Sequence, residues 1–101
     1  MKKTKRIDLF TEKDMAKHYG DFFAYMYNEH NGNMPLSEIA NRTKKCWQGV
    51  YNPCNVRFIL CNEIPYSMLV EFNDTEYEFT FNIYPNIVDT IQLNTVRVCD
   101  E

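Results

Sequence analysis

The sequence has few of the residues that small-molecule chemistry usually needs. Three glycines in 101 residues leave little material for a phosphate-binding loop, and the chain has no P-loop, G-x-G-x-x-G or H-E-x-x-H motif. Its two histidines lie far along the chain from its four cysteines, which form no Cys-x2-Cys pair. A structural zinc site is therefore not expected. We expect no catalytic residue, no metal and no cofactor.

Long apolar runs are also missing. No segment approaches the roughly 18 apolar residues of a membrane-spanning helix. Asp8, Glu12 and Asp14 follow the basic start, Met1–Arg6, where a signal peptide needs an apolar stretch. We expect a single cytoplasmic domain over residues 1–101, with residues 1–6 as a flexible basic tail. In that compartment the cysteines are expected to be reduced thiols, several of them buried.

The net charge of −3 combines two unlike halves. Residues 1–50 contain nine lysines and arginines against six acidic residues. Residues 51–101 contain eight acidic residues against two arginines, Arg57 and Arg97. General nucleic-acid binding usually needs a strongly basic domain, so this balance does not favour it. An acidic back half is suited to a partner with a basic surface.

A helix is predicted to follow Thr11, which is suited to cap it, with Phe10 and Met15 spaced as a hydrophobic staple. Asn31-Gly32-Asn33 is expected to end this helix. Between these ends one apolar stripe recurs at helical spacing, made of Met15, Tyr19, Phe22, Phe23, Met26 and Tyr27. Gly20, which costs about 1 kcal/mol relative to alanine in a helix, favours close approach of another element. Ahead of the helix, Lys5–Phe10 is predicted to be a short first strand.

A second helix is predicted to begin at Pro35, because proline is tolerated in the first turn of a helix. Its inner face consists of Leu36, Ile39, Ala40, Thr43 and Trp47. The segment Leu36–Thr43 resembles the first helix of a helix-turn-helix unit, which often reads L-x-x-I-A. That resemblance implies a recognition helix soon after Thr43. The chain continues instead into a predicted loop over Gln48–Pro53.

A hairpin is predicted around Asn73-Asp74. A two-residue turn at this point and the burial of the alternating apolar residues dictate the same register. That register pairs Val70 with Tyr77, Met68 with Phe79 and Tyr66 with Phe81, all on one face. The rings on this face and the aromatic stripe of the first helix are expected to pack against each other. The register also places Glu71 opposite Glu76, and like charges directly opposite are destabilising.

Strands are predicted on both sides of this hairpin. Val56–Cys61 precedes it, with a turn at Glu63–Pro65. Ile87–Cys99 follows as a final strand or bent pair whose alternation changes phase near Asn94, as a bulge would cause. The predicted order is β-α-α-β-β-β-β, or the same without the first strand. The fold class is therefore α+β with two layers, in which two N-terminal helices pack on an antiparallel sheet of four to five strands.

This order of elements resembles the front half of the GNAT acetyltransferase fold, and Phe58–Leu69 is similar to the second hairpin of that family. The resemblance implies a pyrophosphate-binding loop and a helix after Phe79–Tyr84. This chain has Pro85–Val88 and another strand there, so the acetyl-CoA site does not carry over. The order also resembles the RelE/ParE toxin fold, whose ribonuclease members generally use basic residues on the sheet. Here the corresponding segments are acidic apart from Arg57 and Arg97.

The main hypothesis is a non-enzymatic inhibitor or modulator that binds another protein. The small size, the many Asn, Lys, Ile and Tyr residues and the acidic back half are similar in style to accessory proteins of tailed bacteriophages. Many of those proteins bind and inhibit a host or defence protein, which for a phage-encoded chain means action in the host cytoplasm. The partner would have a basic surface and would meet an acidic one formed by Glu71, Asp74, Glu76 and Glu78. The Glu71–Glu76 conflict supports this choice, because local conflicts can mark functional sites.

Two other classes of function stay open. Nucleic-acid binding through basic residues would be salt-dependent, and the residues concerned are Lys2, Lys3, Lys5, Arg6, Arg42, Lys44 and Lys45. A small toxin-like or degenerate acyltransferase-like enzyme would need a pocket that brings His18 or His30 near a carboxylate or a thiol. A homodimer is also compatible with the sequence, since the β-rich C-terminus is expected to leave an exposed strand edge.

Overall fold

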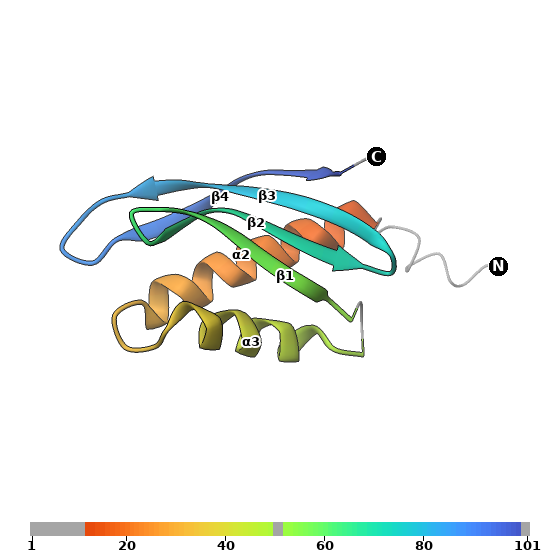
Figure 1. Ribbon diagram of the computed structural model, residues 1–101, viewed down its shortest axis with the longest axis horizontal. Coiled ribbons are helices and arrows are strands. Elements are labelled where there is room, and N and C mark those ends of the chain that lie inside the picture. The colour runs from red at the N-terminus through yellow and green to blue at the C-terminus, as the bar shows by residue number, and fades with distance from the viewer. Residues whose placement is uncertain (1–11, 50–51, 100–101) are drawn as a thin grey trace.

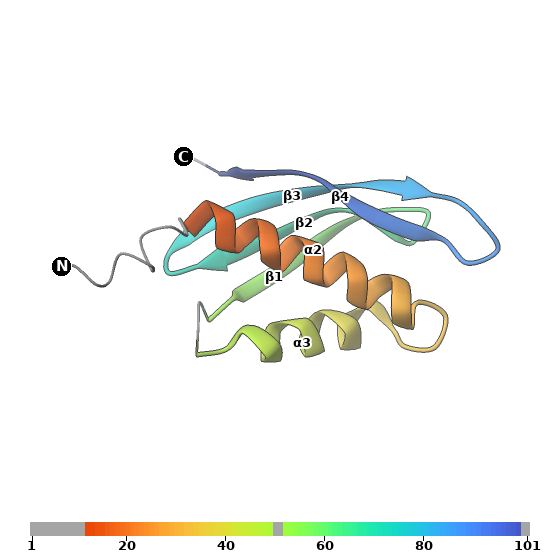
Figure 2. The same cartoon turned by 180° about the vertical axis from the view of Figure 1, so that it is seen from behind.

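A computed structural model of the chain describes residues 12–49 and 52–99 (Figure 1). Its elements in chain order are α2 (Glu12–His30), α3 (Leu36–Trp47), β1 (Cys54–Cys61), β2 (Ile64–Phe72), β3 (Thr75–Tyr84) and β4 (Thr90–Val98). The strands form one antiparallel sheet in the order β1-β2-β3-β4, and both helices lie on the same face of it (Figures 1 and 2). This confirms the predicted two-layer α+β fold. The predicted first strand at Lys5–Phe10, the Thr11 cap and the basic tail of residues 1–6 lie outside the described residues.

The core consists mainly of aromatic rings, as the two stripes in the sequence predicted. Phe23 of α2 is fully buried, and its ring centroid lies 5.4 Å from that of Phe58 in β1 and 5.7 Å from that of Phe81 in β3. Tyr19 meets Phe72 edge to face at 5.2 Å. Such ring pairs add about 0.5–1.5 kcal/mol each beyond the burial of their area. The rings therefore connect α2 to most of the width of the sheet.

Small residues set the distance between α2 and the sheet. Ala16, Gly20 and Ala24 follow one another at intervals of four residues and are all buried, so they share one face of the helix. A Cβ atom on Gly20 would lie 2.7 Å from Cδ2 of Phe79 and 3.0 Å from Leu93. This confirms the close approach expected at Gly20. Neither α2 nor α3 is long and apolar enough to cross a membrane.

The predicted hairpin is present with its predicted register over most of its length. Asn73 and Asp74 form the turn with φ angles of 49° and 70°, and Val70–Tyr77, Met68–Phe79 and Glu71–Glu76 are partners. Positive φ at both central positions is what a two-residue hairpin loop of type I′ requires. These pairs place the four apolar side chains in the core and the two carboxylates on the opposite face.

Tyr66 departs from the prediction. The β2–β3 ladder begins at Ser67–Thr80, and Tyr66 is 51% exposed rather than buried with the other rings. The cause is a bulge in β2, because Ile59 is opposite Ser67 whereas Leu60 is opposite Pro65, which leaves Tyr66 as the extra residue. The preceding turn is also one position earlier than predicted. It consists of Asn62-Glu63, both at positive φ, and β2 already begins at Ile64.

The final strand has the predicted bulge and a later start. Thr80 is opposite Thr95 and Phe81 is opposite Leu93, so Asn94 is the extra residue. The predicted start at Ile87 is wrong, because β4 begins at Thr90 and Ile87 is fully exposed in the preceding loop. Side-chain bonds shape this loop, since the Asp89 carboxylate accepts a hydrogen bond from the Asn86 N–H at 3.1 Å.

The cysteines are not the small buried residues that the sequence predicted. Cys46, Cys54 and Cys61 are exposed, Cys99 is half-buried, and all four are free thiols. Cys54 and Cys61 are the two ends of the edge strand β1, and Cys46 lies on the outer side of α3. The aromatic rings fill the interior, so the thiols occupy positions that the core does not need.

Candidate functional site

Both helices lie on one face of the sheet, and no described residue of either helix covers the opposite, open face (Figure 2). The predicted acidic residues lie on and beside this open face. Glu71 in β2 and Glu76 and Glu78 in β3 alternate with buried residues, so their carboxylates lie on the open face. Asp74 is exposed in the turn that joins these two strands. The structure therefore brings the four predicted site residues together around the central hairpin.

Both arginines of the acidic half of the chain lie on the same open face. Arg57 reaches from β1 across β2 to form an ion pair with Glu76. Arg97 in β4 pairs with Glu78, with 2.6 Å between Nε and Oε1. Sequence reasoning missed these pairs. The available signal was that Arg57 and Arg97 lie at polar positions of their own strands, but their reach depends on the order of the strands.

The predicted conflict between Glu71 and Glu76 is present and is relieved locally. The two residues are direct partners in the ladder. The Asn55 amide donates a hydrogen bond to the Glu71 carboxylate, while Arg57 neutralises Glu76. Asn55 is placed for this contact by its positive φ of 51°, at a register shift between Cys54 and Arg57. The surface is thus a mixed one, with four carboxylates and two guanidinium groups.

These ion pairs are weak enough to be exchanged for contacts with a partner. The side chains of Arg57 and Arg97 are 60% and 67% exposed. Exposed ion pairs contribute about 0.2–1 kcal/mol. A basic group from another molecule can therefore replace either arginine at small cost, while the two remaining negative charges attract it.

Two thiols lie beside this face, since the Cys54 thiol donates a hydrogen bond to the Glu71 carboxylate at 3.9 Å and Cys99 adjoins Glu76. The Cys99 N–H donates a hydrogen bond of 2.8 Å to the Glu76 carbonyl, which continues the sheet. Burial and then the negative charge of Glu76 raise the pKa of the Cys99 thiol. The protonated thiol is a poor nucleophile, so the surroundings of Cys99 do not favour it as a nucleophile.

Three of the predicted basic residues, Arg42, Lys44 and Lys45, lie on α3. Arg42 pairs with Glu38 along α3 at 3.0 Å, whereas Lys44 is half-buried and Lys45 is exposed. Lys2, Lys3, Lys5 and Arg6 lie outside the described residues. The helix-turn-helix resemblance ends here as well. Since α3 ends at Trp47 and β1 begins at Cys54, there is no room for a recognition helix.

The histidines are apart from the acidic residues of the open face. His18 is exposed on α2, and His30 is at the C-terminal end of that helix. Residues 12–49 and 52–99 contain no group of three or more His, Cys, Asp or Glu side chains placed to hold a metal ion.

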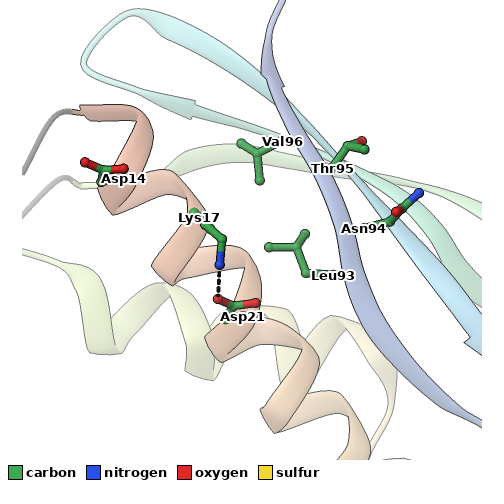
Figure 3. Close-up of a pocket in the computed structure, with 7 residues that line it drawn as sticks. All are labelled: Asp14, Lys17, Asp21, Leu93, Asn94, Thr95 and Val96. Carbon is green, nitrogen blue, oxygen red and sulfur yellow. Dashed lines mark hydrogen bonds and ion pairs between the residues drawn. The ribbon is translucent and has the colours of Figure 1, made fainter.

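A small hollow of about 190 Å³ lies between α2 and β4. Leu93 and Val96 point into it, and Lys17 extends along the helix to Asp21 with an ion-pair distance of 3.1 Å (Figure 3). Asp14 also lines it, but neither histidine does. The hollow thus combines an apolar floor with an exposed ion pair, and it lacks the His–carboxylate or His–thiol pair that the enzyme hypothesis needs.

Comparison of the chain with protein-family models, with curated proteins and with solved structures finds no match. The structure also shows where the acetyltransferase resemblance ends. After β3 the chain forms the loop 85–89 and then β4, and not a pyrophosphate-binding loop with its helix. Function is therefore inferred from the surfaces of the chain itself.

Proposed function

We propose that the protein is a non-enzymatic inhibitor or modulator that binds a partner with a basic surface on the open face of its sheet. The observation that supports this proposal is the convergence of Glu71, Glu76 and Glu78 on two adjacent central strands, with Asp74 at their turn. The paired strands hold the backbone at these positions, so a partner has to order the acidic side chains but not the chain that carries them.

Binding proceeds by exchange of ion pairs. Lysines or arginines of the partner replace Arg57 and Arg97, which turn towards acidic groups of the partner or towards solvent. Complementary charge raises the association rate and selects the partner more than it raises the affinity. In this proposal the chain acts in the cytoplasm, as a phage-type accessory protein that blocks a host or defence protein. Its composition and small size favour that role.

The test compares two variants with equal changes in charge. In the face variant, four acids become amides: Glu71→Gln, Asp74→Asn, Glu76→Gln and Glu78→Gln. In the control variant the same change is made elsewhere: Asp21→Asn, Glu29→Gln, Glu38→Gln and Glu63→Gln. Each set contains two carboxylates in ion pairs with basic side chains. Both variants should therefore lose similar stability, and thermal unfolding checks this.

Each form is then expressed in the native cell and purified with its bound proteins, which quantitative mass spectrometry identifies. The expected result is a partner that the wild type and the control variant retain and the face variant loses. Binding of the purified partner should weaken by about tenfold or more in the face variant. Equal capture by all three forms, or no specific partner with any of them, would contradict the proposal.

A further inference from the structure

The outer edge of β4 is closed by a side chain. Asn28 of α2 donates a hydrogen bond to the Ile91 carbonyl and accepts one from the Ile91 N–H, both at 2.9 Å. The amide thus takes the place that a residue of a neighbouring strand would occupy. The bulge at Asn94 further disturbs this edge, and bulges discourage pairing with another strand. Pairing with a fifth strand is therefore opposed at Ile91 and at the bulge of β4.

The outer edge of β1 has no such cover among the described residues. β1 is an edge strand of the sheet, and no described side chain bonds to an outward backbone group of Phe58 or Leu60. These two residues face outward by the alternation of antiparallel pairs. Cys61 and Ile64 flank the tight turn and form its closing pair. The next residue, Leu60, therefore turns its N–H and C=O away from β2, and Phe58 does the same two positions earlier.

A groove of about 380 Å³ runs beside this edge, between β1 and α3. Ala40 of α3 and Val56 and Phe58 of β1 give it an apolar floor, and Ser37, Asn41, Lys44 and Asn55 complete its lining. An extended segment added to β1 would direct every second side chain into this groove. The arrangement of a free strand edge beside a helix suits recognition by strand addition.

Charge indicates which kind of segment fits. Lys44 lines the groove, and no described residue forms an ion pair or hydrogen bond with its ammonium group. Lys45 is next to it, exposed at the last turn of α3. An uncharged segment added to β1 would partly bury the Lys44 ammonium group in the groove without a partner, which is unfavourable. An acidic segment of another protein would instead place its carboxylate beside Lys44.

Exposed apolar residues on β1 support the same conclusion. Ile59 and Leu60 are 51% and 49% exposed although both belong to a strand. We propose that β1 and α3 form a docking site for an extended acidic segment of another protein, which adds to the sheet as a fifth strand. Apolar side chains of the segment fill the groove over Ala40 and Phe58, and an acidic side chain binds Lys44. This site adjoins the open face at Asn55, but it does not depend on the function proposed for that face.

The probe for this site is a displayed library of random peptides of about twelve residues, long enough to cover the eight residues of β1. Enriched sequences are synthesised and their affinities measured by fluorescence anisotropy. We expect them to alternate apolar residues and to carry Asp or Glu. Lys44→Glu should weaken their binding by about tenfold or more, as loss of a charged contact does. Lys45→Glu makes the same charge change outside the groove and should have an effect of less than about threefold.

A second pair of variants tests strand addition itself. Leu60→Pro removes the outward N–H and should abolish peptide binding. An edge strand tolerates proline at a position whose N–H faces outward. Leu60→Thr keeps the N–H and should retain binding. The four-amide variant of the open face should also retain it, which separates this site from the proposed function. Thermal unfolding establishes which variants are folded. If Leu60→Pro does not fold, the comparison of Lys44→Glu with Lys45→Glu tests the docking site.

Three results would overturn the proposal. The first is that no peptide is enriched on the folded wild type. The second is that Lys44→Glu and Lys45→Glu change binding equally. The third is that sedimentation shows a dimer of the wild type that Leu60→Pro converts to a monomer, because a second copy would then be the occupant of β1.

Discussion

The two edges of the sheet differ in how the chain treats their backbone. At β4 the Asn28 amide bonds to both backbone groups of Ile91, and a bulge follows at Asn94. At β1 the outward groups of Phe58 and Leu60 have no such partner among the described residues, and a groove lies beside them. Natural sheets generally protect their edges against pairing with other chains. The contacts at Ile91 and the bulge at Asn94 oppose strand addition on β4, and the described residues make no such contacts at Phe58 and Leu60 of β1.

The largest effect is expected from opening the closed edge. Asn28→Ala removes two hydrogen bonds and leaves the part-buried backbone groups of Ile91 without partners, so the free energy of unfolding should fall by about 2 kcal/mol. Urea unfolding measures this change. Asn82→Ala, the same substitution at an exposed position of β3, should cost less than about 0.5 kcal/mol. Equal losses of unfolding free energy in the two variants would show that the hydrogen bonds of Asn28 to Ile91 do not stabilise β4.

The next largest effect concerns the distance between α2 and β4. Gly20→Ala gains about 1 kcal/mol of helix propensity, but its Cβ would lie 2.7 Å from Cδ2 of Phe79, which is fully buried. Overpacking of this kind costs about 1–3 kcal/mol. We expect a net destabilisation of about 1 kcal/mol in thermal unfolding. Asn41→Ala, on the exposed side of α3, gives a propensity gain without a clash and should not destabilise. A more stable Gly20→Ala protein would contradict the close packing of α2 on β3 and β4.

A smaller effect is expected from the two arginines, which extend from opposite edges over the open face. Arg57→Gln and Arg97→Gln each remove one exposed ion pair, so each should cost less than about 1 kcal/mol. The Arg57 variant should cost slightly more, because the Glu71–Glu76 conflict is then uncovered. Salt should reduce both losses. A loss of several kcal/mol in either variant would mean that the arginines are structural and not exchangeable for a partner.

The smallest effect is a fall in stability at alkaline pH, which comes from two tyrosines of α2. Burial and then the charge of Asp89 raise the pKa of Tyr27, and burial raises the pKa of Tyr19. The unfolded chain loses these phenol protons first, at a pH near 10. Stability is therefore complete below about pH 10 and declines as the pH rises further. Urea midpoints between neutral and strongly alkaline pH measure this decline, and Tyr27→Phe should reduce it. An unchanged profile in that variant would assign the decline to other groups.

Local patterns predicted those parts of the fold that depend on neighbouring residues. The turn at Asn73-Asp74 and the alternation around it dictate one register, and the phase change near Asn94 correctly indicates a bulge. The prediction for Tyr66 was wrong because its bulge arises from the pairing of β1 with β2, which includes Pro65. The predicted burial of the cysteines was also wrong, because aromatic rings and aliphatic side chains such as Met68 and Val70 fill the core.

The candidate sites were predicted less completely, because they depend on contacts between distant segments. The four acids were found from their spacing in one hairpin, whereas the reach of Arg57 to Glu76 depends on the order of three strands. Asn28 is 63 residues from Ile91 in the sequence. Its one local signal is its place four residues after Ala24, at the end of the small-residue face of α2, and that spacing does not name a partner.

Amide hydrogen exchange of the native protein, followed by NMR, tests the difference between the two edges most directly. The Ile91 amide is bonded to Asn28 and should exchange slowly, whereas the amides of Phe58 and Leu60 should exchange quickly although they lie in a strand. Asn28→Ala should make Ile91 as fast as these two. Slow exchange of Phe58 and Leu60 at a rate similar to that of Ile91 would show that the β1 edge is already covered, and would contradict the proposed difference between the edges.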